Sequence, residues 1–376
     1  MRRFGLIPGF ALALAAWAFS ALAMAEEKKA TIKVGPDAAA VKAARQRGID
    51  FLKTTQADDG SWTSSDSPGI TGLVTISLLR SGVKADDPTV AKALKKLSGF
   101  IQKDGGIYFE QGGHQNYETS ICLLAFQEAN AGGQYDKLVA SARDYLKKIQ
   151  WDEEEDTKPD DVKFGGAGYG KAGNRPDLSN TSFLLDALKA AGVGPDDPAM
   201  KNAVIFVSRC QNLESPANTT PFAAKVNDGG FYYTPAAGGQ SQAGPTENGG
   251  LRSYGSMTYA GLKSMIFAGV GPDDPRVKAA VNWLKKHYSV KENPGMGQTG
   301  VYYYYHTFAK ALDTMHMAQF EDADGKKHDW RKELGDQLMK LQKENGSWVN
   351  AEKRWMEADP NMATAYALMT LVYCSK

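Results

Sequence analysis

The chain has 376 residues, with 44 Lys and Arg against 43 Asp and Glu, which gives a formal net charge of +1. This balance excludes a nucleic-acid-binding protein built on a basic face, and it also excludes a disordered acidic tail. Hydrophobic residues make up 42% of the chain, which is enough for a large buried core. Glycine occurs 39 times, and in a helix-rich composition this frequency predicts many similar turns.

The N-terminus has the pattern of a secretory signal peptide. Arg2 and Arg3 form a short positive region, residues 6–22 are mostly apolar, and residues 23–25 read Ala-Met-Ala. We therefore expect a signal peptide over residues 1–25, cleavage after Ala25, and export to the periplasm or the exterior. An uncleaved N-terminal anchor is the alternative. The mature chain has no further apolar run long enough to predict a transmembrane segment.

Three cysteines occur in apolar helical contexts, at Cys122, Cys210 and Cys374. A low and odd count in an exported protein argues against a disulfide framework. We expect buried free thiols, although one bridge is compatible with the count.

A phrase that marks helix boundaries occurs three times. AGVGPDDP begins at Ala191 and again at Ala268, and a looser copy, SGVKADDP, begins at Ser81. In each copy the glycine is placed to end one helix, the second aspartate to cap the next, and the proline to occupy its first position. Paired aspartates also occur in metal and diphosphate motifs, but this context favours capping.

A second phrase repeats along the whole chain. Gln56 is followed by Gly60, Ser61 and Trp62, and near the C-terminus Gln342 is followed by the same Gly-Ser-Trp at residues 346–348. A mean step of about 57 residues predicts six self-similar units. Weaker copies lie around Gln102, Gln150, Gln211 and Tyr288.

Each unit predicts an amphipathic helix, a Gly-rich turn and a second helix that is apolar nearly all round and therefore buried. Six such hairpins can close into a ring, so we expect an all-α fold, an α6/α6 toroid, with residues 26–376 as a single domain. Short strands are expected in the turns at Phe231–Thr234 and Val301–Tyr303. The predicted inner helices are Thr71–Leu79, Tyr117–Gln127, Ser179–Ala190, Tyr254–Ala268, Tyr304–His316 and Ala363–Tyr373.

Residues 47–62 fill every slot of the QW motif of squalene cyclases, R-G-x-x-F-L-x-x-x-Q-x-x-x-G-x-W. The chain therefore resembles the prenyltransferase and squalene oxidase repeat family, which includes terpenoid cyclases and protein prenyltransferases. The resemblance covers essentially the whole mature chain and implies an α/α toroid. It also implies that Gln56, Trp62, Gln342 and Trp348 are structural residues that tie the turns to the outer helices.

The same resemblance allows the acid motif of class II cyclases, Asp-x-Asp-Asp, to be sought in this chain. Asp177 matches the first aspartate, but Ser179 replaces the protonating acid and Asn180 replaces the last one. A serine hydroxyl is far too weak an acid to protonate an alkene. We therefore do not expect proton-initiated cyclisation. A second candidate, Asp322–Gly325, is predicted to be a solvated turn.

Protein prenyltransferases use a zinc site, and the resemblance extends to part of it. His306 matches the histidine ligand, but Tyr254 and Ser256 stand where an aspartate and a cysteine would be needed. One imidazole does not make a zinc site, so we expect no metal and no other cofactor. His306 is then either a polar group of the cavity or a core histidine.

The starts of the inner helices are expected to surround one mouth of a central cavity. Their partial positive charge favours an anionic head group, and aromatic walls favour an apolar tail. The alternative is that the aromatic rings fill the centre of the toroid. The expected cavity residues are Tyr117, Asn180, Tyr254, Tyr304 and Asn361, with Asp177, Glu118 and His306 as candidate catalytic groups.

Three functional hypotheses follow. The first is an exported toroid that binds an apolar or amphiphilic, isoprenoid-like small molecule or a protein partner, with no nucleic acid involved. The second is an active prenyl- or terpenoid-processing enzyme that uses other residues. The third, by analogy of fold, is a carbohydrate-active enzyme in which Glu118 and Asp177 face each other across a groove.

Overall fold

The structure, a computed structural model, describes residues 35–170 and 175–376. The predicted signal peptide and its cleavage after Ala25 lie outside the described residues. No helix in the described part is long and apolar enough to span a bilayer. The longer helices are α1 (Ala38–Thr54), α2 (Pro68–Arg80), α3 (Pro88–Ser98), α4 (Gln115–Glu128), α5 (Asp136–Lys148), α6 (Leu178–Ala190), α7 (Pro198–Arg209), α9 (Gly255–Phe267), α10 (Pro275–Lys286), α11 (Val301–Thr314), α12 (Trp330–Leu341) and α13 (Pro360–Cys374). Three short helices, η1 (Glu153–Glu155), α8 (Ala223–Val226) and η2 (Arg354–Met356), lie in the loops.

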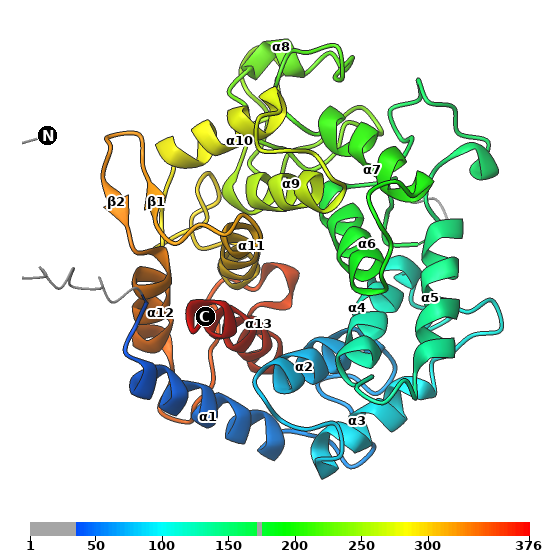
Figure 1. Ribbon diagram of the computed structural model, residues 1–376, viewed down its shortest axis with the longest axis vertical. Helices are drawn as coiled ribbons and strands as arrows, with labels where there is room; N and C mark the ends of the chain where they lie inside the picture. Colours follow the sequence, from blue (N-terminus) through cyan, green and yellow to red (C-terminus); the bar gives the residue numbers. More distant parts are fainter. Residues whose placement is uncertain (1–34, 171–174) are drawn as a thin grey trace, which may run out of the picture. The chain divides into compact units, whose positions relative to one another are not determined.

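Within the described residues the helices form two concentric rings (Figure 1). The inner helices α2, α4, α6, α9, α11 and α13 pack against one another in chain order, and α13 packs against α2 to close the ring. The outer helices α1, α3, α5, α7, α10 and α12 cover them, and α12 meets α1. The α6/α6 toroid expected from the sequence is confirmed.

The two rings differ in how their side chains are buried. Inner helix α13 is buried at every position from Asn361 to Leu371, because it contacts both neighbours and an outer helix. Outer helix α3 buries only Val90, Ala93, Leu94 and Leu97, the three- and four-residue spacing of one helical face. The apolar and amphipathic patterns of the sequence therefore separate inner from outer helices.

The capping interpretation of the Asp-Asp-Pro phrase is confirmed. The side chains of Asp87, Asp197 and Asp274 accept hydrogen bonds from backbone amides two residues later, at 3.0, 2.9 and 2.9 Å. Each following proline occupies the first turn of α3, α7 or α10. These aspartates begin outer helices, so they stabilise helix starts rather than form a metal site.

The glutamines of the QW phrases link neighbouring units. The Gln56 amide donates to the carbonyl of Gly60 in its own turn, at 3.1 Å, and to that of Thr89 in the next outer helix, at 2.9 Å. Gln342 makes the same pair of bonds, to Gly346 and to Ala44 of α1. The structural role is thus confirmed, and each glutamine also joins two adjacent outer helices. Gln150 and Gln211 repeat this arrangement.

The tryptophans of these phrases are fully buried and hydrogen-bonded. The indole of Trp62 donates to the Leu52 carbonyl at 2.8 Å, and its backbone amide donates to the hydroxyl of Thr71 at 3.1 Å. A threonine stands at the equivalent position in the first turns of five inner helices, and its hydroxyl accepts a hydrogen bond from a backbone amide of the Gly-rich turn before that helix. We call it the repeated threonine, and it was not apparent from the sequence. Its five copies are Thr71, Thr119, Thr181, Thr258 and Thr364.

One predicted strand is wrong, because Val301–Tyr303 is the first turn of α11. Gly300 precedes this helix in the left-handed conformation, with φ of 68°, and being glycine it has no side chain to cap the first turn. Instead the buried carboxylate of Glu357 accepts from the Tyr303 amide at 2.8 Å. Phe231–Thr234 forms only isolated bridges at its two ends.

The single two-stranded sheet of the described residues lies between α11 and α12. It pairs β1 (Phe320–Glu321) with β2 (Lys327–His328) in antiparallel register. Asp322–Gly325 forms its connecting turn, as the sequence predicted, and the Asp322 side chain accepts from the amides of Asp324 and Lys326.

Candidate functional site

The repeated threonine allows residues of different inner helices to be compared, because residues at the same distance from it in the sequence lie at the same height along the axis of the toroid. On α6, the side chains of Ser179, Phe183 and Asp186 stand two residues before Thr181, two after it and five after it. All three contact residues of inner helices further round the ring. These positions therefore define three levels along the axis, from the N-terminal to the C-terminal ends of the inner helices.

Four aromatic side chains from four inner helices meet near the N-terminal end of the axis. Phe183 of α6 packs edge-on against Tyr117 of α4, with centroids 5.2 Å apart, and stacks on Tyr303 of α11 at 5.9 Å. Tyr303 meets Tyr366 of α13 at 6.0 Å, and the Tyr366 and Tyr117 hydroxyls interact. We call these four residues the axial aromatic cluster. Since α6 and α11 are not neighbours, the rings pack across the axis rather than merely line it.

The cluster is nevertheless not fully buried. Tyr117, Ser179 and Tyr303 are only half-buried, although all three belong to inner helices. The Ser179 hydroxyl donates to the Tyr303 hydroxyl at 3.1 Å. Thus the position that corresponds to the protonating acid of class II cyclases carries a hydroxyl paired with another hydroxyl.

Asp177, the remaining carboxyl of that motif, caps α6. It accepts from the backbone amide of Asn180 at 2.9 Å and from its side-chain amide at 2.8 Å. Burial raises the pKa of Asp177 to about 6, against the opposing effect of its contacts with Asn180 and Tyr233. Tyr254 is buried nearby, within electrostatic range of both Tyr303 and Asp177.

Glu118 is hydrogen-bonded to residues of the first two units rather than to Asp177. Its two carboxylate oxygens accept from the Ser67 hydroxyl at 2.7 Å and from the Phe109 amide at 2.8 Å, and the side chain is 1% exposed. These contacts tie the start of α2 to the turn before α4, and burial raises the Glu118 pKa. The two carboxyls have separate structural partners, which is not the arrangement that the carbohydrate hypothesis requires.

Two of the expected cavity residues lie elsewhere. The Tyr304 hydroxyl donates to the Ser289 carbonyl at 2.6 Å, and its ring packs on Tyr259 and Phe308 between the helix layers. Asn361 bonds to the hydroxyls of Thr55 and Thr63 in the first unit. Tyr117, Asn180 and Tyr254 stand at the starts of α4, α6 and α9, where Asn180 and Tyr254 are buried and Tyr117 belongs to the axial aromatic cluster.

Sequence reasoning missed Phe183 and Tyr366, and from the four tyrosines at 302–305 it selected Tyr304 rather than Tyr303. Four consecutive tyrosines, at residues 302–305, do not show from the sequence which ring faces the axis. In the structure only Tyr303 does, and the other three rings pack elsewhere. Counting from the repeated threonine would have identified Phe183 and Tyr366, both two residues after it. On α11 a tyrosine, Tyr305, stands where the other inner helices have the repeated threonine, so the same count could not be made there from the sequence.

One to two helical turns further along the axis, charged side chains replace aromatic ones. Asp186 of α6 accepts from Lys263 of α9 at 2.5 Å and from Lys310 of α11 at 2.7 Å. Burial alone would raise the pKa of Asp186, but the two lysines outweigh it and lower this pKa to about 2. Burial lowers the pKa of Lys263 to about 8. We call these three residues the lumenal charge cluster.

His306 lies beside this cluster rather than at the N-terminal mouth. Its ring is within 5.8 Å of the Tyr366 ring, and it is 6% exposed. Burial, followed by the charges of Lys310 and Arg80, holds its pKa well below the usual value. Across residues 35–170 and 175–376, no three His, Cys, Asp or Glu side chains are grouped to hold a metal ion. Cys122, Cys210 and Cys374 are buried and free.

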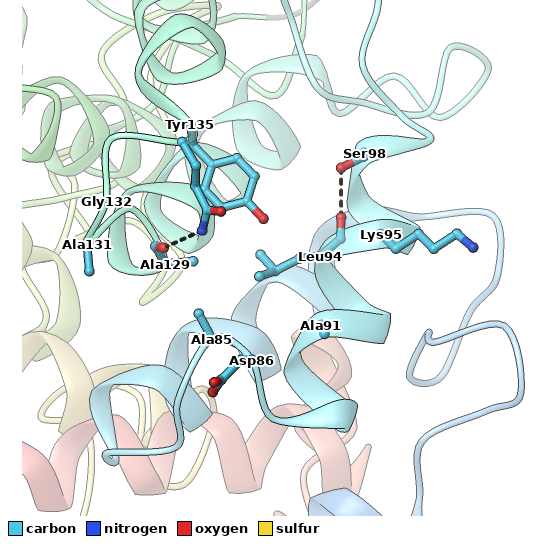
Figure 2. Close-up of a pocket in the computed structure, with 11 residues that line it drawn as sticks. Ala85, Asp86, Ala91, Leu94, Lys95, Ser98, Ala129, Ala131, Gly132 and Tyr135 are labelled. Atoms are coloured by element: carbon cyan, nitrogen blue, oxygen red, sulfur yellow. Dashed lines mark hydrogen bonds between the residues drawn. The ribbon is translucent and has the colours of Figure 1, made fainter.

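A groove of about 490 Å³ lies in the outer ring, between α3 and the loop that leads into α5 (Figure 2). Leu94 of α3 and Tyr135 before α5 lie on its two sides. Lys95 and Ser98 add polar edges, and the Ser98 hydroxyl is bonded to the Leu94 carbonyl. None of the expected site residues lines this groove.

With the geometry described, the fold can be compared with known proteins. It is the α/α toroid of type II terpene cyclases: the cyclase MstE from Scytonema and a single-substitution variant superpose with TM-scores of 0.54 and 0.56. Both are 12% identical in sequence, and the alignments cover 90% of this chain and 99% and 98% of the cyclases. No protein-family model matches the chain.

In sequence, the chain is similar to the squalene–hopene cyclase of Alicyclobacillus acidocaldarius. The two are 26% identical over 193 residues, which is 50% of this chain and 29% of the cyclase. The match thus spans less than a third of that cyclase's length. The chain resembles terpenoid cyclases in sequence pattern and in fold, as the QW phrases predicted.

Proposed function

We propose that this protein is exported and binds an apolar, isoprenoid-like ligand at the axial aromatic cluster, without proton-initiated cyclisation. The likeness to terpene and squalene–hopene cyclases supports an isoprenoid as the class of ligand. Aromatic faces bind apolar chains, and the four rings of this cluster come from four different inner helices. The partial exposure of Tyr117, Ser179 and Tyr303 supports the access of a ligand to the cluster.

The observation that carries this proposal is the Ser179–Tyr303 hydroxyl pair at the position of the cyclase acid. Protonation of an alkene needs a strong and available acid. Asp177 is the nearest carboxyl in the motif, but it is engaged at the start of α6, and its raised pKa makes it a weaker acid. Binding rather than cyclisation is therefore the function that this geometry supports best.

A neutral isoprenoid alcohol tests the binding part. Farnesol titrated into the wild-type protein should bind saturably. Phe183→Leu, which keeps an apolar side chain but removes the ring, should weaken binding about tenfold, or about 1.4 kcal/mol. Tyr135→Ala in the outer groove is the matched control and should bind like wild type. Absence of saturable binding, or loss of binding only in Tyr135→Ala, would overturn the proposal.

The second part is tested by chemistry. Squalene incubated with the wild-type protein should be recovered unchanged by gas chromatography and mass spectrometry. Formation of a cyclised hydrocarbon in wild type, lost in Asp177→Asn, would show that the remaining carboxyl does act as the acid.

A further inference from the structure

The C-terminal half of the toroid axis holds more buried positive than negative charge. Lys263 and Lys310 share one carboxylate, that of Asp186, and the three residues are 2, 8 and 5% exposed. Around them, Arg80 of α2 pairs with Glu128 of α4 at 2.7 Å, and Tyr373 of α13 completes the ring. The pair of Arg80 and Glu128 is neutral, so the lumenal charge cluster retains one uncompensated positive charge.

The two ammonium groups also have unused hydrogen-bond donors. Each carries three N–H bonds, and in the part of the chain described here Asp186 accepts one from each. Four donors therefore remain on two side chains that are almost fully buried. Both ammonium nitrogens also lie 5.7 Å from the centroid of the Phe267 ring, whose face attracts cations. A ring face is a weaker acceptor than a charged oxygen, so an anion would give these donors better partners.

His306 provides an independent sign of a missing partner. Its Nδ1 atom is buried and makes no hydrogen bond to any described residue. The ring lies between Tyr366 and Tyr373, with centroids 5.8 and 6.1 Å away, on the Lys310 side of the axis. Burial, and after it the charges of the nearby cations, lowers the pKa of this imidazole, and a bound anion would reduce the effect of the cations.

The end of the inner ring beyond the cluster is accessible. Arg80, Phe267 and Tyr373 are half-buried and Glu128 is exposed, although all four stand on inner helices. These residues lie nine positions after the repeated threonine, one turn beyond the lysines. A ligand can thus reach the cluster from the C-terminal ends of the inner helices.

We propose that the lumenal charge cluster binds an anionic group, a carboxylate or a phosphate, between Lys263 and Lys310. The unused ammonium donors supply its hydrogen bonds, and the uncompensated positive charge supplies the attraction. That this anion is the head group of the isoprenoid-like ligand rests on the proposed function. Phe183 and Asp186 are one helical turn apart on α6, so a head at the lysines places the tail against the axial aromatic cluster. This orientation reverses the one expected from the helix N-termini.

The anion site is tested first without any tail. The pKa of His306 is followed by NMR of its ring proton, assigned by comparison with His306→Asn, as inorganic phosphate or acetate is added. In wild type the pKa should rise saturably. In Lys310→Met, which leaves the Asp186–Lys263 pair intact, it should start higher and not respond to the anions. Lys278→Met, an exposed lysine on α10, is the matched control and should respond like wild type.

Geranyl phosphate and geraniol then separate the head group from the tail. Geranyl phosphate should bind wild type at least tenfold more tightly than Lys310→Met, whereas geraniol should bind both proteins equally. Thermal melts show whether Lys310→Met and Lys263→Met are folded. If Lys310→Met is not folded, Lys263→Met replaces it in these binding measurements.

The outcomes distinguish the two proposals. If geraniol binds but neither anion moves the His306 pKa, the anion site is overturned while the proposed function stands. If the anions bind but geraniol and farnesol do not, the anion site stands and the proposed function fails. An equal response to phosphate in wild type and Lys310→Met also overturns the site.

Discussion

Ser179 and Tyr303 stand on inner helices that are not neighbours in the ring, yet their hydroxyl oxygens lie 3.1 Å apart. A contact of this kind requires the inner helices to curve round the axis, so that α6 and α11 face each other across it in matching register. The same approach of α11 to α6 places the Tyr303 ring over Phe183, which follows Ser179 by one turn on α6.

This pair gives the first prediction. Ser179→Ala and Tyr303→Phe should each lower the free energy of unfolding by about 1 kcal/mol, because each leaves one half-buried hydroxyl without its partner. The double variant should lose little more than either single one, since the same bond is removed. Denaturant unfolding of the four proteins measures the coupling. Fully additive losses would show that the two hydroxyls do not interact in solution.

Trp62 and Trp348 should matter for stability and not for ligand binding. Both are fully buried, and each indole donates to a carbonyl of the preceding outer helix at 2.8 Å. Replacement by alanine should cost about 3–5 kcal/mol in unfolding free energy. Trp355, which is 38% exposed, is the control, and its replacement should change stability by no more than about 0.5 kcal/mol. A Trp62→Ala protein with an unchanged melt but no farnesol binding would contradict the structural role.

Asp177 should make stability depend on pH in the acidic range. Burial raises its pKa from 3.8 to about 6, so the folded state retains a proton that the unfolded state loses between these values. Its contribution to stability is therefore fully present below pH 4 and is lost as the pH rises through 6. The loss amounts to about 3 kcal/mol, at 1.36 kcal/mol per pKa unit.

Asp177→Asn tests this sign. Asparagine can still cap α6, but it does not titrate. Relative to wild type, the variant should gain about 3 kcal/mol of unfolding free energy between pH 4 and pH 7. Parallel stability curves for the two proteins over this range would show that the carboxyl is not perturbed.

Gly165 and Gly192 separate the cost of a left-handed residue from the cost of a steric clash. Both have φ of 82°, but a Cβ on Gly165 would lie 1.8 Å from the Asn202 carbonyl of α7, whereas nothing lies within 4 Å of one on Gly192. Gly192→Ala should cost about 1–2 kcal/mol, the penalty of the left-handed conformation. Gly165→Ala should cost about 2–3 kcal/mol more, because the turn must move away from α7. Equal losses in thermal or denaturant unfolding would show that the turn does not pack on α7.

The sequence by itself determined the architecture. Repeated Gln, Gly and Trp, capped helix starts and the contrast between apolar and amphipathic helices are local patterns, and each has one physical meaning wherever it occurs. Six copies are therefore enough to predict six hairpins and two rings. The resemblance to the QW motif implied that Gln56 and Trp62 are structural, and their partners do lie in the turn and in the helices next to it.

Only the tertiary structure decided what occupies the axis. The side chains there come from helices far apart in the chain, and a rotation of about 100° per residue decides which one points inward. Tyr303 faces the axis while Tyr304 packs between the layers, although the two are adjacent and chemically identical. Lys263 and Lys310 likewise appear in the sequence as ordinary helical lysines. They become a buried charge cluster because closure of the ring brings both to Asp186.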